Sequence, residues 1–268
     1  MKLLGSDIRR YARVWYRSIT LHFGVLTSSR ADFLFFFAGK VLRMAFFLVF
    51  FLALFSITPM IAGYTKGEVL LFFATMNMID VLVQLLWYRG LTILPNMVKR
   101  GDFDLILTKP ISPLFQVAFH VFDFFDLATV PVALGIIAYA FSFLPALTAM
   151  QWVGYVVFVF IGLFLAFAVN LFLASLTFYA VESANLWWMY RDLIYVARFP
   201  PEVFPNGVRI VFTYVIPILM IVSFSTKAAL GRLSPGVALY AIVLTFLALF
   251  ATVRFWKRGL QAYQSASS

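Results

Sequence analysis

The stretch Trp152–Phe178 has the sequence WVGYVVFVFIGLFLAFAVNLFLASLTF and holds no acidic or basic side chain. A transmembrane helix needs about 20 consecutive, mostly apolar residues, because that length crosses the hydrocarbon core of a bilayer. The stretch therefore predicts a membrane-spanning helix. Other apolar stretches of spanning length lie on both sides of it, so the predicted fold class is an all-α, polytopic membrane protein.

The composition of the whole chain points the same way. It has 268 residues, of which 63% are hydrophobic and 12% are charged, and its mean hydropathy is +0.96. Soluble domains carry about 25% charged residues, so an ordinary soluble protein and a disordered chain are excluded. The absence of Cys excludes disulfides and thiolate metal sites. The net charge of +10 is expected to mark the cytoplasmic face and anionic headgroups rather than a nucleic-acid partner.

Six spans are predicted within residues 33–268, which form one transmembrane domain. Pro217 is expected to kink the fifth span. Residues 182–207 are too charged for a simple span but rich in Trp and Tyr, so they are expected to be interfacial or re-entrant. The predicted spans are Val41–Ala62, Glu68–Tyr88, Phe119–Phe141, Trp152–Phe178, Val208–Ala229 and Gly236–Val253.

Residues 1–32 predict a cytoplasmic amphipathic helix. Their apolar side chains recur at helical spacing, and most of the arginines lie off that stripe. A basic helix of this kind suits the plane of the membrane interface, although it could also pack on the protein itself. The stripe includes Ile8, Tyr11, Trp15, Ile19 and Phe23.

The distribution of Lys and Arg predicts the orientation. Eighteen of the 21 lie near the termini or in the segments after the second and fourth spans. The other three, Lys66, Lys227 and Arg232, lie on the opposite side. Because positive residues are retained in the cytoplasm, both termini are predicted to be cytoplasmic, which requires an even number of spans.

Sequence motifs of enzymes are missing. The two histidines, His22 and His120, are far apart, and neither HExxH nor the nucleotide-binding GxxxxGK[ST] occurs. The chain is therefore not expected to be an enzyme or to hold a metal ion, a cofactor or a nucleotide.

The segment 93–118 joins the second and third spans and is predicted to be cytoplasmic. Gly101 permits a turn, Asp102 can cap a short helix over Phe103–Thr108, and Pro110 ends it. Such a helix, with an apolar face and charged flanks, suits docking of a cytosolic partner. A loop that only connects two spans fits the same residues.

The residues of this segment resemble a known family. Gly101–Gln116, GDFDLILTKPISPLFQ, is similar to the pattern of permeases of the type-2 ATP-binding-cassette exporter class, in the bacterial branch described as ABC-2 family transporter protein. Ala197–Pro205, ARFPPEVFP, resembles the same branch and is followed by Tyr214–Pro217 and Leu230-Gly231. The resemblance covers nearly the whole chain in topology.

The resemblance implies a division of labour. The chain would be the permease subunit of an exporter in the bacterial cytoplasmic membrane and would form the translocation path with a second permease, identical or related. Two copies of a separate cytosolic ATPase would bind ATP and Mg²⁺. The loop after the second span would carry the coupling helix that rests on this ATPase, with the contact residues Lys99, Arg100, Asp102, Phe103, Asp104 and Lys109.

Polar residues recur within the second span. Asn77, Asp80, Gln84 and Tyr88 are three or four residues apart, so they share one face of a helix. They are expected to line the translocation path or a contact between permeases. The alternative is a structural hydrogen-bond network between helices of one subunit.

The third span begins with three ionisable residues, His120, Asp123 and Asp126, predicted to share one helical face. The helix dipole and a salt bridge to a loop Arg would explain the acids, and a gate is the alternative. A proton-coupled secondary transporter would use Asp80 or the Asp123/Asp126 pair as its relay. A membrane scaffold without transport is a further alternative.

Overall fold

A computed structural model describes residues 9–21, 30–180 and 184–263, and within these the chain is helical with no β-strand. A β-bridge between Ile61 and Tyr64 closes the turn after the first long helix. Residues 9–21 form a helix. The elements that follow are α2 (Arg30–Ile57), α3 (Lys66–Val83), the π-helical turn η1 (Gln84–Tyr88), α4 (Arg89–Arg100), α5 (Phe103–Leu107), α6 (Pro113–Phe119), α7 (Phe124–Leu127), α8 (Val130–Phe141), α9 (Ala149–Leu176), α10 (Ala184–Val196), the 3₁₀ turn η2 (Pro201–Val203), α11 (Asn206–Ile210), the π-helical turn η3 (Val211–Val215), α12 (Ile218–Ala229) and α13 (Pro235–Ala262).

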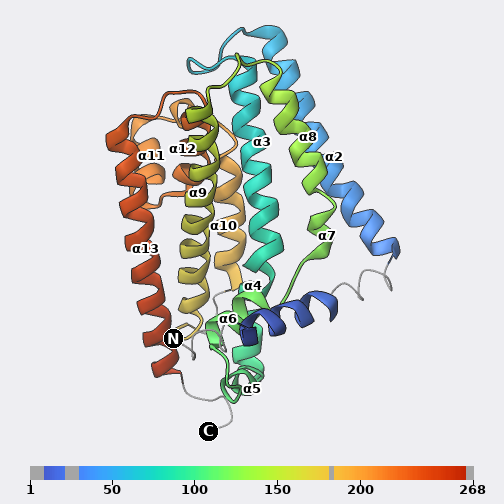
Figure 1. The fold of residues 1–268 in the computed structure, drawn as a ribbon, viewed down its shortest axis with the longest axis vertical. Helices are drawn as coiled ribbons and strands as arrows, with labels where there is room; N and C mark the ends of the chain where they lie inside the picture. The colour runs from blue at the N-terminus through green and yellow to red at the C-terminus, as the bar shows by residue number, and fades with distance from the viewer. Residues whose placement is uncertain (1–8, 22–29, 181–183, 264–268) are drawn as a thin grey trace.

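Helix α3 lies at the centre of the bundle, with α2 and α8 on one side and α9, α12 and α13 on the other (Figure 1). Helix α3 is part of a longer helix, Lys66–Arg100. In the most apolar 18-residue stretch of that helix, 72% of the residues are buried, against 11–44% in the other four helices of spanning length. A polar side chain on α3 therefore faces protein rather than lipid.

The first two spans are longer than predicted. Helix α2 begins at Arg30, so Lys40 and Arg43, expected at the edge of the span, lie well inside it. Helices α3, η1 and α4 form one continuous helix, Lys66–Arg100, so the predicted cytoplasmic segment begins inside α4 rather than as a loop. Gly101 ends this helix in the left-handed conformation, with φ +80°, as its lack of a side chain allows.

The third span is broken near its start. Helix α6 ends at Phe119, and α7 begins at Phe124. Between them the carboxylate of Asp123 accepts a hydrogen bond from the Phe125 N–H at 3.2 Å and caps α7. The prediction that His120, Asp123 and Asp126 share one helical face is therefore wrong, because the helix is interrupted between them.

The fifth span is also broken. The helix pair Asn206–Val215 and Ile218–Ala229 is bent by 92°. Pro217 lacks a backbone N–H and pushes Ile216 out of the helical conformation (φ −116°, ψ 84°). The predicted kink is confirmed, and it is sharp enough to divide the predicted span Val208–Ala229 into two helices. Among the described residues, five helices can cross a membrane, or six if the bent pair counts as one span.

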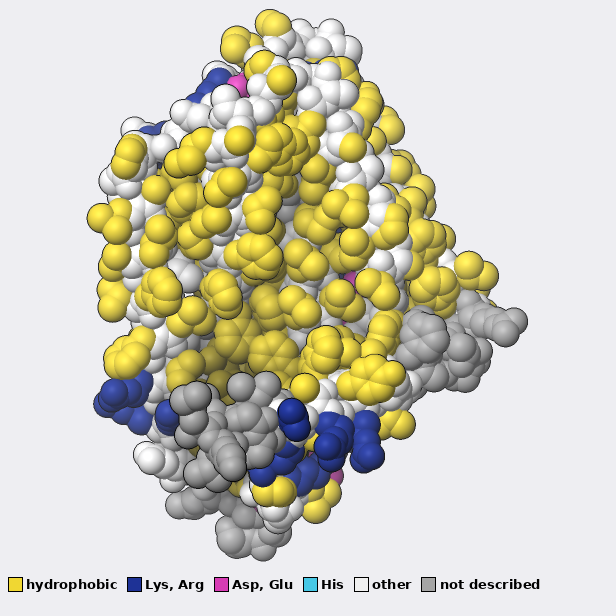
Figure 2. Space-filling view, viewed as in Figure 1, with side chains coloured by type: hydrophobic (Ala, Val, Ile, Leu, Met, Phe, Trp, Pro, Cys, Tyr) yellow, Lys and Arg dark blue, Asp and Glu magenta, His cyan; other side chains and the backbone are white. Residues whose placement is uncertain are grey.

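Helix 9–21, α5 and the C-terminal end of α13 lie at the same end of the bundle, which we call the lower end (Figure 1). Exposed Lys and Arg side chains gather there, below a broad apolar surface (Figure 2). The turn between α2 and α3 lies at the opposite, upper end. Both ends of the described chain thus share one side, as an even number of crossings requires.

Candidate functional site

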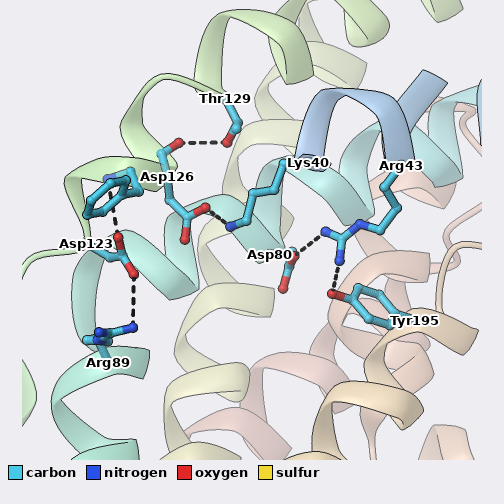
Figure 3. A network of polar contacts seen from close by, with 9 residues as sticks. Lys40, Arg43, Asp80, Arg89, Asp123, Asp126, Thr129 and Tyr195 are labelled. Atoms are coloured by element: carbon cyan, nitrogen blue, oxygen red, sulfur yellow. Dashed lines mark hydrogen bonds and ion pairs between the residues drawn. The ribbon is translucent and has the colours of Figure 1, made fainter. Parts of the chain in front are cut away.

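Buried ion pairs join the helices in the lower half of the bundle (Figure 3). Lys40 on α2 pairs with the carboxylate of Asp126 on α7, whose side chain is completely buried. The backbone carbonyl of Asp126 accepts a hydrogen bond from the Thr129 hydroxyl at 2.7 Å. Because an unpaired buried carboxylate is costly, the ion pair with Lys40 offsets much of the cost of burying Asp126.

Arg43 lies one helical turn further along α2 and links three helices. Its guanidinium is 3.8 Å from the carboxylate of Asp80 on α3. It also donates a hydrogen bond to the hydroxyl of Tyr195 on α10 at 2.6 Å and lies over the Tyr195 ring. Arg43 therefore holds α2, α3 and α10 together at the level of Asp80.

Arg89, at the start of α4, is 3.8 Å from the carboxylate of Asp123. This is the kind of salt bridge expected for the acids of the third span, although Arg89 lies in a helix rather than in a loop. Its side chain is 63% exposed, whereas that of Asp123 is 9% exposed. The pair is therefore accessible to solvent or to a ligand on the side of the arginine.

The polar stripe of the second span divides into two parts. Asn77 and Asp80 are buried, and the Asn77 amide donates to the Phe73 carbonyl of its own helix at 2.7 Å. Gln84 and Tyr88, at the two ends of the π-helical turn, line a cavity. The upper part is thus bonded within the chain, and only the lower part faces open space.

The cavity has a volume of about 640 Å³ and lies between α2, α4 and α10, beside the ion pairs. Ligand sites usually fall between about 300 and 1,000 Å³. Asp123 is the acidic residue of the cavity wall, and Lys, Arg and aromatic side chains form most of the remaining wall. These include Phe36, Lys40, Arg43, Arg89, Trp187 and Arg191.

Helix α5, the predicted coupling helix, is fixed to the bundle by two of its residues. Phe103 is fully buried and packs against Phe178 and Tyr263, with ring centroids 5.5 and 5.2 Å apart. The Tyr263 hydroxyl donates a hydrogen bond to the Asp104 carboxylate at 3.1 Å. Phe103 and Asp104 therefore connect α5 to its own chain.

The other predicted coupling residues lie on the surface. Asp102 occupies the N-cap position of α5 but makes no capping hydrogen bond with its side chain. Leu105 is 65% exposed on the same short helix, so its side chain is accessible to a partner. The exposed charged residues around it are Lys99, Arg100, Asp102 and Lys109.

Helix 9–21 packs against α6 and the break that follows it. The hydroxyl of Tyr11 also accepts a hydrogen bond from the Ser112 N–H at 3.0 Å. Ile8 and Phe23 of the predicted apolar stripe lie outside the described residues. Two ring contacts place this helix: Tyr11 with Phe115, with centroids 4.8 Å apart, and Trp15 with Phe122, with centroids 5.4 Å apart. The Ser18 hydroxyl is also 2.8 Å from Nδ1 of His120.

Charged residues also meet at the upper end. Arg232 contacts Glu68 at 2.6 Å, Lys227 contacts Glu202 at 2.7 Å, and the Tyr64 hydroxyl donates to Glu202 at 3.1 Å. We call these five residues the upper clasp. Burial acts to raise the pKa of Glu202, but the contact with Lys227 outweighs it and holds that pKa below its usual value. Burial and the nearby Glu202 charge raise the pKa of Tyr64.

The fold and the buried charges define a multi-pass α-helical membrane protein. Residues 41–267 match the family model described as ABC-2 family transporter protein, and the chain belongs to that family. It is a membrane permease of ABC-2 type transporters. Permeases of this family are generally non-enzymatic membrane components. No curated protein and no solved structure matches it.

Several residues of the lower cavity were missed by the sequence analysis. Lys40, Arg43 and Arg191 were counted only as positive charge on the cytoplasmic side. A usable signal existed for the first two, because they are three residues apart in an otherwise uncharged stretch and so share a helical face. No comparable signal identified Trp187, since only packing brings α10 next to α4.

Proposed function

We propose that this permease is the membrane subunit of an ATP-driven exporter in a bacterial cytoplasmic membrane, and that it acts with a second permease and two copies of a cytosolic ATPase. The observation that carries the proposal is the continuous helix Lys66–Arg100, which runs from the upper end to the turn before α5. A displacement of α5 would pass through the short turn at Gly101 and then along one helix to Gln84 and Asp80.

The ATPase would bind the exposed side of the coupling region. Leu105 would supply the apolar contact, and Lys99, Arg100, Asp102 and Lys109 would supply the charged flanks. Phe103 and Asp104 take a different part, because they are bonded within the chain. They would transmit the movement of α5 to α9 and α13, whose lower ends adjoin Phe178 and Tyr263.

The transport step follows from this connection. ATP binding would close the two ATPase subunits on each other and shift α5 of each permease. The contact between the permeases would then open a path for an amphiphilic cargo, and Gln84, which lines the lower cavity, would lie along it. Asn77 and Asp80 are buried within the chain and would lie behind this path. The energy would come from the partner, so this chain would bind, orient and release cargo without a covalent step.

The test is co-purification of the tagged full-length chain with its ATPase from the native host in a mild detergent. Leu105→Glu combined with Asp102→Lys should abolish recovery of a P-loop ATPase, because both side chains are exposed and neither is bonded to another described residue. Lys257→Glu changes an exposed charge near the lower end of α13 and should leave recovery unchanged. Equal ATPase recovery with the double variant would overturn the docking assignment.

The proton-coupled alternative gains no support from the geometry. Asp80, Asp123 and Asp126 each form an ion pair with a basic side chain of another helix, so the contacts assign them a role in joining helices. A scaffold without transport would bind the ATPase but move no cargo. Reconstituted vesicles that require ATP for cargo movement would exclude both alternatives.

A further inference from the structure

Two N–H groups in the wall of the lower cavity have no hydrogen-bond acceptor among the described residues. They are Nε1 of Trp187, whose side chain is 5% exposed, and Nε of Arg191. Buried polar atoms are nearly always hydrogen-bonded, because an unmade bond costs the full desolvation of the group. Both groups are donors, so the missing partner is an acceptor.

The charged side chains of the cavity wall indicate which kind of acceptor would fit. Lys40 and Arg43 already hold Asp126 and Asp80, and Arg89 faces Asp123 at 3.8 Å. Arg191 lies over the Trp188 ring at 4.8 Å and makes no ion pair within the described chain. The surplus positive charge is therefore on Arg191, beside the two orphan donors, and a phosphate group matches both.

The position of the cavity indicates that the phosphate belongs to a lipid. The wall residues Phe35 and Trp188 are 80% and 62% exposed. Phe35 belongs to α2, which is among the most lipid-exposed helices of the bundle. The cavity thus joins a charged interior to the apolar surface of the lower half, an arrangement that suits a headgroup inside and acyl chains outside.

We propose that the lower cavity binds the anionic headgroup of a membrane amphiphile, with its phosphate on Arg191 and Trp187 and its acyl chains along α2. The inference rests on the proposed function, because it names the chemical class of the cargo. The Arg43–Tyr195 contact forms the inner end of the site, since these are the furthest wall residues along α2 and α10 from the lower end.

The test is native mass spectrometry of the purified full-length chain in a neutral detergent, titrated with dioctanoyl phosphatidic acid. Dioctanoylglycerol has the same acyl chains without the phosphate, and inorganic phosphate is the headgroup alone. A hydrogen bond to a charged group corresponds to a factor of about 10 to 100 in affinity. The phosphatidic acid should therefore bind at least about tenfold more tightly than either comparator.

The variants locate the site. Trp187→Phe keeps an aromatic ring, although a smaller one, and removes the N–H, and Arg191→Gln removes the charge, so each should weaken phosphatidic acid binding about tenfold. Arg254→Gln is the matched control, because Arg254 also lies over an aromatic ring but on α13, outside this cavity. The Arg254→Gln variant should bind phosphatidic acid with an affinity within about twofold of that of the unchanged chain. If Arg191→Gln does not fold, Trp187→Phe carries the test alone.

Three results would overturn the proposal. Equal binding of dioctanoylglycerol would mean that only the acyl chains are recognised. Equal binding of inorganic phosphate would mean that the site takes a free anion. Unchanged affinity in Trp187→Phe would place the lipid elsewhere. Because the assay needs no ATPase, loss of lipid binding with intact ATPase recovery would leave the exporter standing with another cargo, and the reverse result would leave the lipid site without the exporter.

Discussion

The upper clasp and the lower cavity differ in how completely their charged residues are paired. In the upper clasp, Glu68 and Glu202 meet their bases at 2.6 and 2.7 Å. In the lower half, two of the three ion pairs are 3.8 Å long, and the buried N–H groups of Trp87, Trp187 and Arg191 have no acceptor in the described chain. The charges of the upper clasp are therefore paired by residues of the chain itself, whereas the lower half retains unmatched positive charge.

This difference gives the proposed exporter a direction. Paired charges at the upper end and an open cavity in the lower half would suit a permease before cargo is loaded at the lower end. Release at the upper end would then require the clasp to open, and only an input that favours the open arrangement can shift the equilibrium. The variants below perturb the two ends separately.

The largest effect is expected in the lower half, at the Lys40–Asp126 pair. Lys40→Met should destabilise the protein by about 3–5 kcal/mol, because it leaves a buried carboxylate without a partner. Arg232→Met in the upper clasp should cost about 1 kcal/mol, since Arg232 is 42% exposed. Unfolding by sodium dodecyl sulfate in mixed micelles measures both. The double variant Lys40→Met with Asp126→Leu should recover most of the loss; no recovery would contradict the pairing.

The next largest effect is expected where two helices meet without side chains between them. A Cβ on Gly162 of α9 would lie 2.2 Å from the Ile221 carbonyl of α12, and one on Gly90 would lie 2.1 Å from the Val117 carbonyl. Gly162→Ala and Gly90→Ala should each destabilise by about 1–3 kcal/mol or more. Gly135→Ala, which meets nothing within 4 Å, is the control and should not destabilise. Equal thermal stability of all three variants would refute the close contacts.

A smaller, pH-dependent effect is expected in the upper clasp. The pKa of Glu202 is lowered in the folded protein, so its ionised form stabilises the fold above the usual glutamate pKa of about 4.3. This stabilisation is lost as the pH falls through the lowered value. Glu202→Gln should therefore cost about 1 kcal/mol at pH 7 and almost nothing near pH 3. Unfolding measured at both pH values checks this, with Asp102→Asn as the exposed control; a loss independent of pH would point to packing instead.

The smallest effect on stability is expected at the coupling helix. Leu105→Ser should change the free energy of unfolding by less than about 0.5 kcal/mol, because Leu105 is exposed. Phe103→Ala on the same helix should cost about 3–5 kcal/mol. The contrast is read from unfolding curves of the purified chain without ATPase. A large loss in Leu105→Ser would mean that this side chain packs within the protein and is not free for a partner.

Local sequence was enough for the class of fold. Runs such as Trp152–Phe178 hold no charged side chain and are long enough to cross a bilayer, so composition and length alone predict an all-α membrane protein. Gly101 and Pro217 act on the backbone through their own covalent structure, and the turn and the kink were predictable for that reason. The family was recognisable from Gly101–Gln116, and the match over residues 41–267 confirms it.

The site depended on contacts between segments far apart in the chain. Lys40 and Asp126 are paired because α2 packs beside α7, and no local pattern contains that distance. Phe103 had the spacing of a docking residue, but Phe178 and Tyr263 cover it from elsewhere. Periodicity describes which residues share a face of one helix. Long-range packing decides which neighbouring helix then buries that face. At Trp187 and Arg191, this packing leaves two N–H donors without an acceptor among the described residues.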